Sequence, residues 1–444
     1  MTDFYFNSDP KKLPQPLEGI HPVQIFDSHP LDKHNNSWAS RSIVARIRKL
    51  GVKVSDEAFD FVTIATAVTA AESFELRSNA LNNWSRELHL HIPVINVEKW
   101  MAVRERLAKL LGFLTGDQWE LTFEKSQLAV PEPTNSANAK AKGKSLIGLN
   151  SVCLFSGGLD SAVGALDILN GKSSDKPLLV SHAYRADKGK QGKIKKLLKG
   201  AFGELSYSIS PHLAGRIKHD LDTSMRGRSF NFMALAVLGI SALRSANMDD
   251  SISKIIVPEN GYISINPPLT RRRIGSNSTR TTHPNFLGQL EDLLKDLGFN
   301  ITFHNPYQFK TKGEMLAECK DQAAIQIAAP LSVSCSHWHR RHIQCGYCVP
   351  CLIRRASIFH AGFTKDAKYE VSKIKNIMKE IEKRDDVIAL QAAILRLKES
   401  PDCMAWIRQS GPLPEDKKTR IKLEGTVSRG LAEVEAYFKS VKLA

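Results

Sequence analysis

Apolar residues follow two different periods in the first 130 residues of the chain. They recur at helical spacing over residues 61–68, which predicts a buried helix. Residues 88–94 and 119–123 alternate apolar and polar positions, which predicts strands, and a helical pattern over 97–111 lies between them. Residues 1–130 are therefore expected to form a small α+β accessory domain, in which no catalytic group stands out.

The pattern changes after residue 150, where short apolar segments are separated by helical stretches. Strands are predicted at residues 151–155, 178–184, 205–209, 254–257 and 301–304. Strand–helix alternation with nearly continuous apolar strands predicts an α/β fold with a parallel, doubly wound sheet. In such sheets, ligands bind at the carboxyl ends of the strands, where the strand order reverses.

The composition of the remaining segments suggests the domain boundaries. Residues 131–149 are rich in small and polar residues and are expected to be an interdomain linker. Residues 150–367 are expected to hold the parallel sheet together with a cysteine-rich subdomain. Residues 368–444, rich in Lys and Glu, are expected to form a helical C-terminal extension.

Charge and cysteine content narrow the class of protein. Of the 444 residues, 62 are Lys or Arg and 46 are Asp or Glu, so the net charge is +16. This excess would attract nucleic acid, nucleotide phosphates or an acidic partner, or serve solubility alone. No nucleic-acid-binding domain is recognisable, and the longest apolar stretch, residues 230–243, is shorter than the roughly 18 residues that a membrane span needs. Seven cysteines and no apolar leader indicate reduced thiols and a cytoplasmic protein.

The most informative segment is a glycine-containing turn between an apolar strand and an amphipathic helix. It consists of Ser156, Gly157, Gly158, Leu159, Asp160 and Ser161. The two glycines let the backbone turn sharply, and the helix N-terminus offers free N–H groups and a partial positive charge to an anion. The two serines add hydroxyl donors, and Asp160 could hold Mg2+ or orient the loop. The alternative is an ordinary Gly-Ser turn that caps a helix.

Four cysteines are concentrated in one segment, at Cys335, Cys345, Cys348 and Cys351. Convergent thiolates at this spacing suit Zn2+ in a closed, tetrahedral, structural site. Three histidines between the first two cysteines, His337, His339 and His342, offer an alternative fourth ligand. Use of all four cysteines as small apolar side chains is disfavoured by their density.

The glycine turn and the cysteine segment, followed by Arg354-Arg355 and Gly362-Phe363, together resemble the 7-cyano-7-deazaguanine synthase (QueC) family. The resemblance covers residues 150–365. It implies a PP-loop ATP pyrophosphatase that binds ATP, Mg2+ and Zn2+ and adenylates the carboxylate of 7-carboxy-7-deazaguanine, with release of pyrophosphate. The extensions at both ends are similar in layout to QueC-like proteins of antiphage operons, most of all the Qat type, and imply a partner protein from the same operon.

Residues outside the turn are also expected to contact ligands. Arg228, beside a predicted helix start, and Lys312, which resembles a family lysine at another, are expected to reach phosphate. Glu259 follows a strand and should lie at the carboxyl edge of the sheet. Residues 266–283 are expected to form a substrate lid, with contacts from Arg280, Thr281, Thr282 and His283. The alternatives are a solvated basic turn at Arg228, a helix cap at Lys312 and a disordered basic loop over 266–283.

Two classes of function are consistent with these residues. The first is an enzyme in which Asp160, Ser161 and Arg228 act on ATP, and the adenylate is transferred to ammonia or to an amine on a partner protein. Adenylation is required because a carboxylate is a poor electrophile. The second is a catalytically weak nucleotide-binding scaffold of a defence complex. A third hypothesis is a PP-loop enzyme that modifies tRNA.

Overall fold

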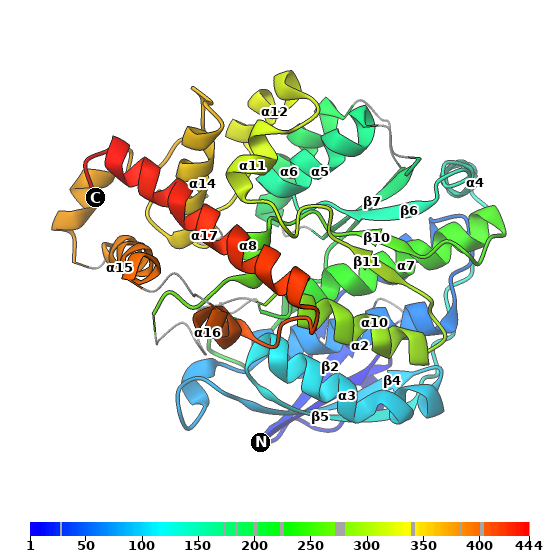
Figure 1. The fold of residues 1–444 in the computed structure, drawn as a ribbon. Coiled ribbons are helices and arrows are strands. Elements are labelled where there is room, and N and C mark those ends of the chain that lie inside the picture. The colour runs from blue at the N-terminus through cyan, green and yellow to red at the C-terminus, as the bar shows by residue number, and fades with distance from the viewer. Residues whose placement is uncertain are drawn as a thin grey trace.

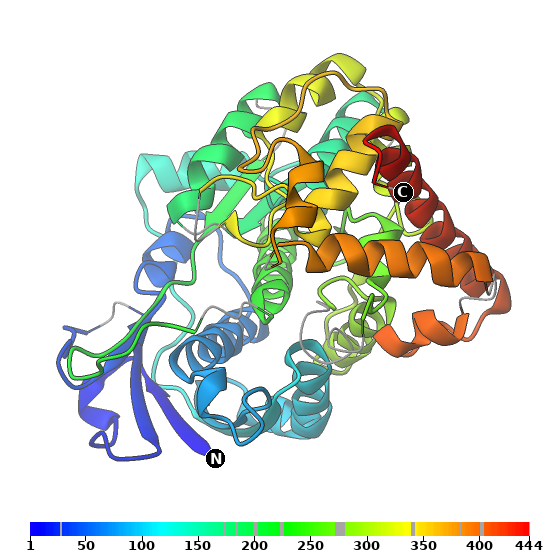
Figure 2. The ribbon, with the colours of Figure 1, turned by 90° about the vertical axis from the view of Figure 1, so that its left-hand side faces the viewer.

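The protein is described here by a computed structural model that covers residues 1–26, 29–171, 174–182, 185–198, 203–222, 226–270, 280–338, 342–381, 383–399 and 404–443. Two sheets and the helices around them give an α/β fold, as predicted. In Figure 1 the N-terminal sheet lies at the bottom, the second sheet above it, and the C-terminal helices pack along one side. The same three regions are seen from the side in Figure 2.

The N-terminal sheet has the strand order β5-β4-β1-β2-β3-β9. Its strands are β1 (Thr2–Asn7), β2 (Ile20–Ile25), β3 (Ser37–Ala39), β4 (Glu87–Val94), β5 (Gln118–Lys125) and β9 (Pro211–His212). Its helices are α1 (Ile43–Arg48), α2 (Asp56–Phe74) and α3 (Val97–Thr115). The pairs among β1 to β5 are parallel, and only β9 is antiparallel. The expected α+β arrangement is therefore replaced by α/β, because alternation along a strand reports its burial and not its direction of pairing.

The second sheet is fully parallel, with the order β11-β10-β6-β7-β8. Its strands are β6 (Ser151–Leu154), β7 (Pro177–His182), β8 (Gly203–Tyr207), β10 (Lys254–Ile256) and β11 (Thr302–His304). The five predicted strands are thus confirmed with small shifts in their ends; residues 183 and 184 of the second lie outside the described part of the chain. The strand order reverses between β6 and β10, which is the expected ligand position in such a sheet.

Helices cover both faces and one side of this second sheet. They are α5 (Leu159–Asn170), α6 (Arg185–Leu197), α7 (Arg228–Asn247), α8 (Gly261–Ile265), α10 (Pro284–Asp296), α11 (Lys312–Ala317), α12 (Gln322–Ala328), α14 (Val349–His360), α15 (Asp385–Glu399), α16 (Met404–Ile407) and α17 (Lys417–Ser440). Short 3-10 turns occur at Pro10–Lys12, Arg77–Asn79, Ala329–Leu331, Ile374–Lys379 and Arg408–Ser410. The predicted helical character of the C-terminal extension is confirmed by α15, α16 and α17.

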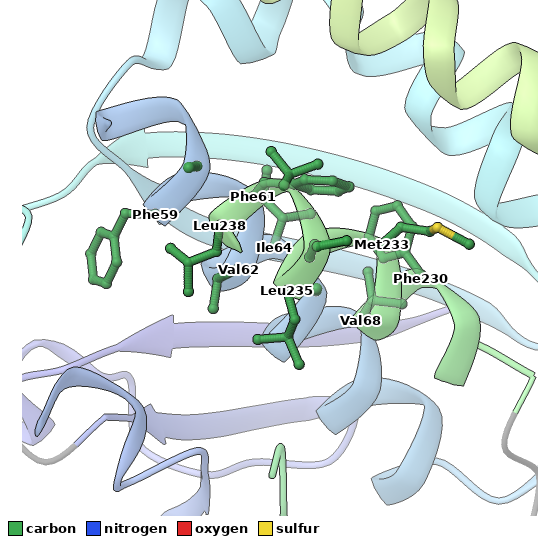
Figure 3. Packing of buried hydrophobic residues seen from close by; sticks show 14 of the residues in the cluster. Phe59, Phe61, Val62, Ile64, Val68, Phe230, Met233, Leu235 and Leu238 are labelled. Atoms are coloured by element: carbon green, nitrogen blue, oxygen red, sulfur yellow. The ribbon is translucent and has the colours of Figure 1, made fainter. Parts of the chain in front are cut away.

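The two sheets share one continuous apolar core. Helix α2 from the N-terminal region packs against α7 from the second, and the rings of Phe61 and Phe230 meet edge to face at 5.1 Å. Figure 3 shows these side chains interleaved between the two helices. Among the described residues α7 alone is long and apolar enough to cross a membrane, yet 83% of its apolar window is buried inside the structure, as in a core helix.

The predicted linker contains regular structure. Residues 137–144 form helix α4 (Ala137–Lys144), which begins at Ser136, whose hydroxyl accepts a hydrogen bond from the Ala139 amide at 3.2 Å. Gly143 packs against the Gly51 backbone so closely that a Cβ at Gly51 would lie 1.9 Å from the Ala139 carbonyl oxygen. The alanines and lysines of this segment favour a helix, and its small residues allow close packing instead of a free linker.

Candidate functional site

The glycine turn connects β6 to α5, as the sequence predicts. Gly157 has φ +77°, and a Cβ there would lie 2.5 Å from Gln191 Cγ, so this position requires glycine. Ser156 Oγ accepts a hydrogen bond from the Gly158 amide at 3.2 Å, and Ser161 Oγ donates to the Gly158 carbonyl oxygen at 3.0 Å. The buried Gln191 amide donates to the Ser156 carbonyl oxygen at 2.8 Å. The turn is therefore held rigid by its own serines and by α6.

A cavity of about 330 Å³ opens beside this turn, at the reversal point between β6 and β10. Its volume is at the lower end of the range typical of small-molecule sites. Its lining comes from distant parts of the chain and includes Ser156, Gly157, Gly158, Ser161, Lys190, Arg228, Phe232, Glu259, Thr281, Thr282, Cys335 and Trp338. The predicted residues of the turn, together with Arg228, Glu259 and the two threonines, are thus brought to one cavity.

Two cations face this cavity from different helices. Arg228 is the first residue of α7, and its guanidinium carbon lies 5.8 Å from the centre of the Phe232 ring. Lys190 of α6 lies with its ammonium 5.6 Å from the centre of the Trp338 ring, and burial lowers its pKa. Lys190 was not singled out from the sequence, where it belongs to a lysine-rich run. Together the two side chains give the cavity wall a positive charge suited to an anion.

Asp160 and Lys312 are placed differently from the expectation. Neither lines the cavity; they form an ion pair with each other and are only 6% and 8% exposed. Asn260 Nδ2 also donates to Asp160 Oδ2 at 2.7 Å. Although burial acts to raise the pKa of Asp160, the Lys312 ammonium and these hydrogen bonds lower it to about 2. Asp160 is therefore a buried anion already engaged by a cation and an amide, and Lys312 points at this carboxylate instead of a phosphate.

Glu259 lies between this ion pair and the cavity. It follows β10 at the carboxyl edge of the sheet, as expected, and lines the cavity. Burial, together with the negative charge of Asp160, raises the pKa of Glu259 well above its usual range. The surroundings therefore favour opposite forms of the two neighbouring carboxyl groups: the ionised form of Asp160 and the protonated form of Glu259.

The four predicted contacts at residues 280–283 separate into two pairs. Thr281 and Thr282 line the cavity, as expected. Arg280 instead donates to the carbonyl oxygens of Ser410 and Phe113, at 2.8 and 2.9 Å. His283 is fully buried, caps α10 and contacts Ser410, and burial lowers its pKa to about 4. Both side chains therefore join the C-terminal segment to α3 and α10. Residues 271–279 of the expected lid lie outside the described part of the chain.

The four predicted cysteines form one buried group next to the cavity. Their sulfur atoms all lie within 4.8 Å of one another, and two Sγ–Sγ pairs, Cys345–Cys351 and Cys348–Cys335, are 3.9 Å apart. A tetrahedral ion with Zn–S bonds of about 2.3 Å separates its sulfurs by about 3.8 Å. Gly346, at φ +88°, provides the turn between Cys345 and Cys348. The group is placed to hold a metal ion such as zinc.

Backbone amides point at these sulfurs. The amides of His337 and Cys345 donate to Cys335 Sγ, each at 3.3 Å, and the Cys348 amide donates to Cys345 Sγ at 3.3 Å. Such donors stabilise thiolates that bind a metal. The group that the described residues form consists of the four cysteines alone, as the first prediction has it. The His337 side chain is hydrogen-bonded to Cys345, and His339 lies outside the described residues.

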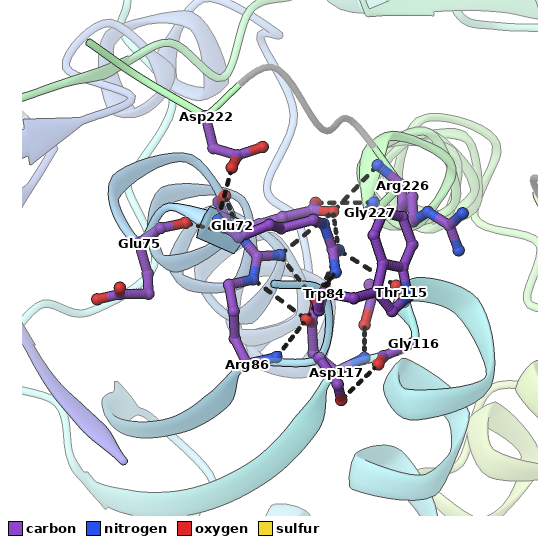
Figure 4. A network of polar contacts seen from close by, with 12 residues as sticks. Glu72, Glu75, Trp84, Arg86, Thr115, Gly116, Asp117, Asp222, Arg226 and Gly227 are labelled. Atoms are coloured by element: carbon purple, nitrogen blue, oxygen red, sulfur yellow. Dashed lines mark hydrogen bonds and ion pairs between the residues drawn. The ribbon is translucent and has the colours of Figure 1, made fainter. Parts of the chain in front are cut away.

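The position of Arg228 depends on a buried carboxylate from the N-terminal region. Glu72 on α2, 2% exposed, accepts hydrogen bonds from the amides of Arg226 and Gly227, at 3.0 and 2.8 Å. Figure 4 shows Glu72 and Asp117 with Arg86 and Arg226 around the start of α7. A Cβ at Gly227 would lie 2.5 Å from Glu72 Oε2. The N-terminal region therefore holds the helix start that carries Arg228.

Burial raises the pKa of Glu72 to about 7, so its charge is fully present only at higher pH. At pH 9 we expect Glu72→Gln to lower the free energy of unfolding by about 3 kcal/mol, because it removes the negative charge that faces two amides and the guanidinium groups of a buried network. Urea unfolding of the purified variant measures this. The matched control is Glu75→Gln, directly after the end of α2, whose carboxylate contacts Thr2 and Asn79 nearer the surface. Equal stability of the two variants would contradict the role assigned to Glu72.

The C-terminal extension contributes a second carboxylate of the same kind. Glu433 on α17, 6% exposed, accepts hydrogen bonds from the Thr311 hydroxyl and, at 3.2 Å, from the Gly313 amide. These two residues flank Lys312 at the start of α11. Glu72 and Glu433 were both missed from the sequence, because no local pattern distinguishes them from solvated acids on an amphipathic helix.

Comparisons with protein-family models, with curated proteins and with solved structures found no match to this chain.

Proposed function

We propose that this protein is an ATP-dependent enzyme that adenylates a carboxylate, of the 7-carboxy-7-deazaguanine class, and transfers it to an amine in an antiphage system. The observation that carries the proposal is the Ser156–Ser161 turn at the strand-reversal point, on a cavity that also has Arg228 and Lys190 in its wall. The resemblance of this turn and the cysteine group to the PP-loop deazaguanine synthases supplies the substrate class.

The residues that would hold ATP are those of the turn. The first amides of α5 and the hydroxyls of Ser156 and Ser161 would bind phosphate oxygens. Arg228 and Lys190 would neutralise the negative charge that grows on the departing pyrophosphate. Bound ATP supplies the adenylate that makes a carboxylate oxygen a good leaving group. Glu259 also lines the cavity, where its surroundings favour the protonated carboxyl, and the Thr281 and Thr282 hydroxyls would offer further hydrogen-bonding groups to the substrate.

The sequence suggested Asp160 as a ligand of Mg2+. Asp160 is engaged by Lys312 and Asn260, so it does not fit as a Mg2+ ligand. Mg2+ would accompany the nucleotide phosphates, as in sites where most of its ligands are phosphate oxygens and water. The role that fits Asp160 is to hold Lys312 and the Glu259 segment beside the turn.

The test is the release of AMP and pyrophosphate from ATP, Mg2+ and 7-carboxy-7-deazaguanine. We expect Ser161→Ala to slow release about a hundredfold, as the loss of one transition-state donor does. The control is Ser145→Ala, at the exposed end of α4, which should leave the rate unchanged. Nucleotide binding without release of AMP and pyrophosphate would favour a nucleotide-binding scaffold. Release of these products only in the presence of tRNA would favour a tRNA-modifying enzyme.

The acceptor is tested separately, by intact-mass measurement of operon partner proteins coexpressed with the wild-type or the Ser161→Ala protein. A deazaguanine amide on a partner would add mass only with the wild type. Free amide or nitrile without a modified partner would identify ammonia as the acceptor. The +16 net charge suits an acidic partner surface.

A further inference from the structure

A second group of metal-ligand side chains lies on the N-terminal sheet, far from the cysteine segment in sequence. Asp3 on β1 and His89 and His91 on β4 place their ligand atoms within 4.8 Å of one another. Asp3 Oδ1 is 2.8 Å from His89 Nδ1 and 3.4 Å from His91 Nε2. From this geometry we infer that Asp3, His89 and His91 bind a divalent transition-metal ion, of which Zn2+ is the probe used below.

The sheet geometry explains why these three residues meet. Strands β1 and β4 are parallel neighbours, and Asp3 is paired directly with His89. Phe4, Leu88 and Leu90 are buried, so the alternate positions that carry Asp3, His89 and His91 face outward. Two ligands of a tetrahedral ion with bonds of about 2.1 Å lie about 3.4 Å apart. The Asp3–His91 spacing already matches this value, and the Asp3–His89 spacing would have to widen by about 0.6 Å.

In each of the two histidines, the ring nitrogen that does not face Asp3 also lies near a polar group. His89 Nε2 lies 2.9 Å from the Thr122 hydroxyl, and His91 Nδ1 lies 4.0 Å from a Glu124 carboxylate oxygen. A metal-bound imidazole commonly donates its second N–H to such a group, which fixes its tautomer and orientation. The His91 ring also stacks on Tyr5, with ring centres 4.0 Å apart. Both imidazoles are therefore oriented by neighbours on β1 and β5.

The charge of this face favours a cation. Glu87, Glu120 and Glu124 occupy outward positions on β4 and β5 around the group, in a chain whose net charge is +16. The three ligand side chains are partly exposed, with Asp3 at 33% and the histidines near 15%. Three protein ligands at an accessible surface leave a coordination position for water or for a group on another molecule. This is the pattern of an exchangeable site and differs from the closed, four-sulfur group.

The experiment measures zinc per chain in the untagged, full-length protein after equilibration with Zn2+ and removal of loose metal. We expect the His89→Ala/His91→Ala double variant and Asp3→Asn each to hold one equivalent less than the wild type. Because these side chains lie on the outer face, the unfolding midpoint in the presence of a chelator should match the wild type. The matched control, His212→Ala on β9 of the same sheet, should retain the full zinc content.

A second variant separates metal binding from simple hydrogen bonding. Thr122→Val removes only the outer partner of His89 and should weaken zinc binding by about 10- to 100-fold. Equal zinc content and affinity in the wild type, the double variant and Asp3→Asn would overturn the inference, as would an equal loss of zinc in His212→Ala. The result is independent of the proposed ATP chemistry, because no activity is measured.

Discussion

Cys351→Ser is expected to release the metal ion and to lower the free energy of unfolding by more than about 4 kcal/mol, the largest change anticipated for a single substitution in this chain. Cys351 is fully buried, and its sulfur faces Cys345 at 3.9 Å. A serine hydroxyl is a poor zinc ligand, so three thiolates would be left close together in a buried site without a cation. These thiolates would have to bind protons, and residues 335–351 would no longer be held together by a metal ion.

Metal content and urea unfolding test this expectation together. The wild type should contain one zinc per chain more than the variant, and a strong chelator should destabilise the wild type while changing the variant little. The matched control is Cys319→Ser, a buried cysteine outside the group, which should keep its metal. Equal metal content in Cys351→Ser and the wild type, or iron in place of zinc, would refute the assignment.

The parts of the site that could be predicted from the sequence are those whose residues are adjacent in the chain. The glycine turn, from Ser156 to Ser161, is one continuous segment, so its strand–turn–helix setting follows from local patterns, and the structure has it. The cysteine group follows from short spacings in the same way. Strands β6 and β7 of the second sheet were also predictable, because fully buried strands are continuous apolar segments.

The parts that were not predictable depend on contacts between distant segments. Arg280 and His283 were expected at the ligand because they belong to a basic loop, but both contact Ser410, more than 120 residues later. Lys190 reaches the cavity only because α6 packs over the turn. A single sequence contains no signal for such pairings, since each of these residues would look the same on a solvated surface.

The two extensions also have a role that the sequence did not suggest. They were expected to be separate domains that bind a partner, yet each provides a buried carboxylate to the start of a helix beside the site. Glu72 holds α7, whose first residue is Arg228, and Glu433 holds α11, whose first residue is Lys312. Because each carboxyl group accepts hydrogen bonds from backbone amides at the helix start, these contacts tie the two helices to the extensions. Truncation of either extension would therefore disturb the cavity itself.

The second large effect concerns the ion pair under the glycine turn. Asp160→Ala is expected to lower the free energy of unfolding by about 3 to 5 kcal/mol, because it leaves the Lys312 ammonium buried without its counter-charge. From the sequence, Asp160 was expected to hold Mg2+ or to orient the loop, and the loss of a metal ligand alone would leave the fold intact. Its 6% exposure and its contacts to Lys312 and Asn260 lead to the opposite expectation. A loss of pyrophosphate release in Asp160→Ala would then reflect destabilisation of the site as much as the loss of a catalytic group.

A double variant distinguishes the two roles of Asp160. Asp160→Leu combined with Lys312→Met removes both buried charges and should recover most of the stability that either single change loses, because an apolar pair can replace a buried ion pair at little cost. Urea unfolding of the two single variants and the double variant gives the coupling energy, for which we expect at least about 2 kcal/mol. If Asp160→Ala is instead as stable as the wild type, the ion pair is not structural and Asp160 acts on the ligand. A third outcome is a double variant that recovers stability but releases no pyrophosphate, with Ser145→Ala still active as the control. In that case the Asp160–Lys312 pair is needed to hold the glycine turn and Glu259 in the positions that catalysis requires.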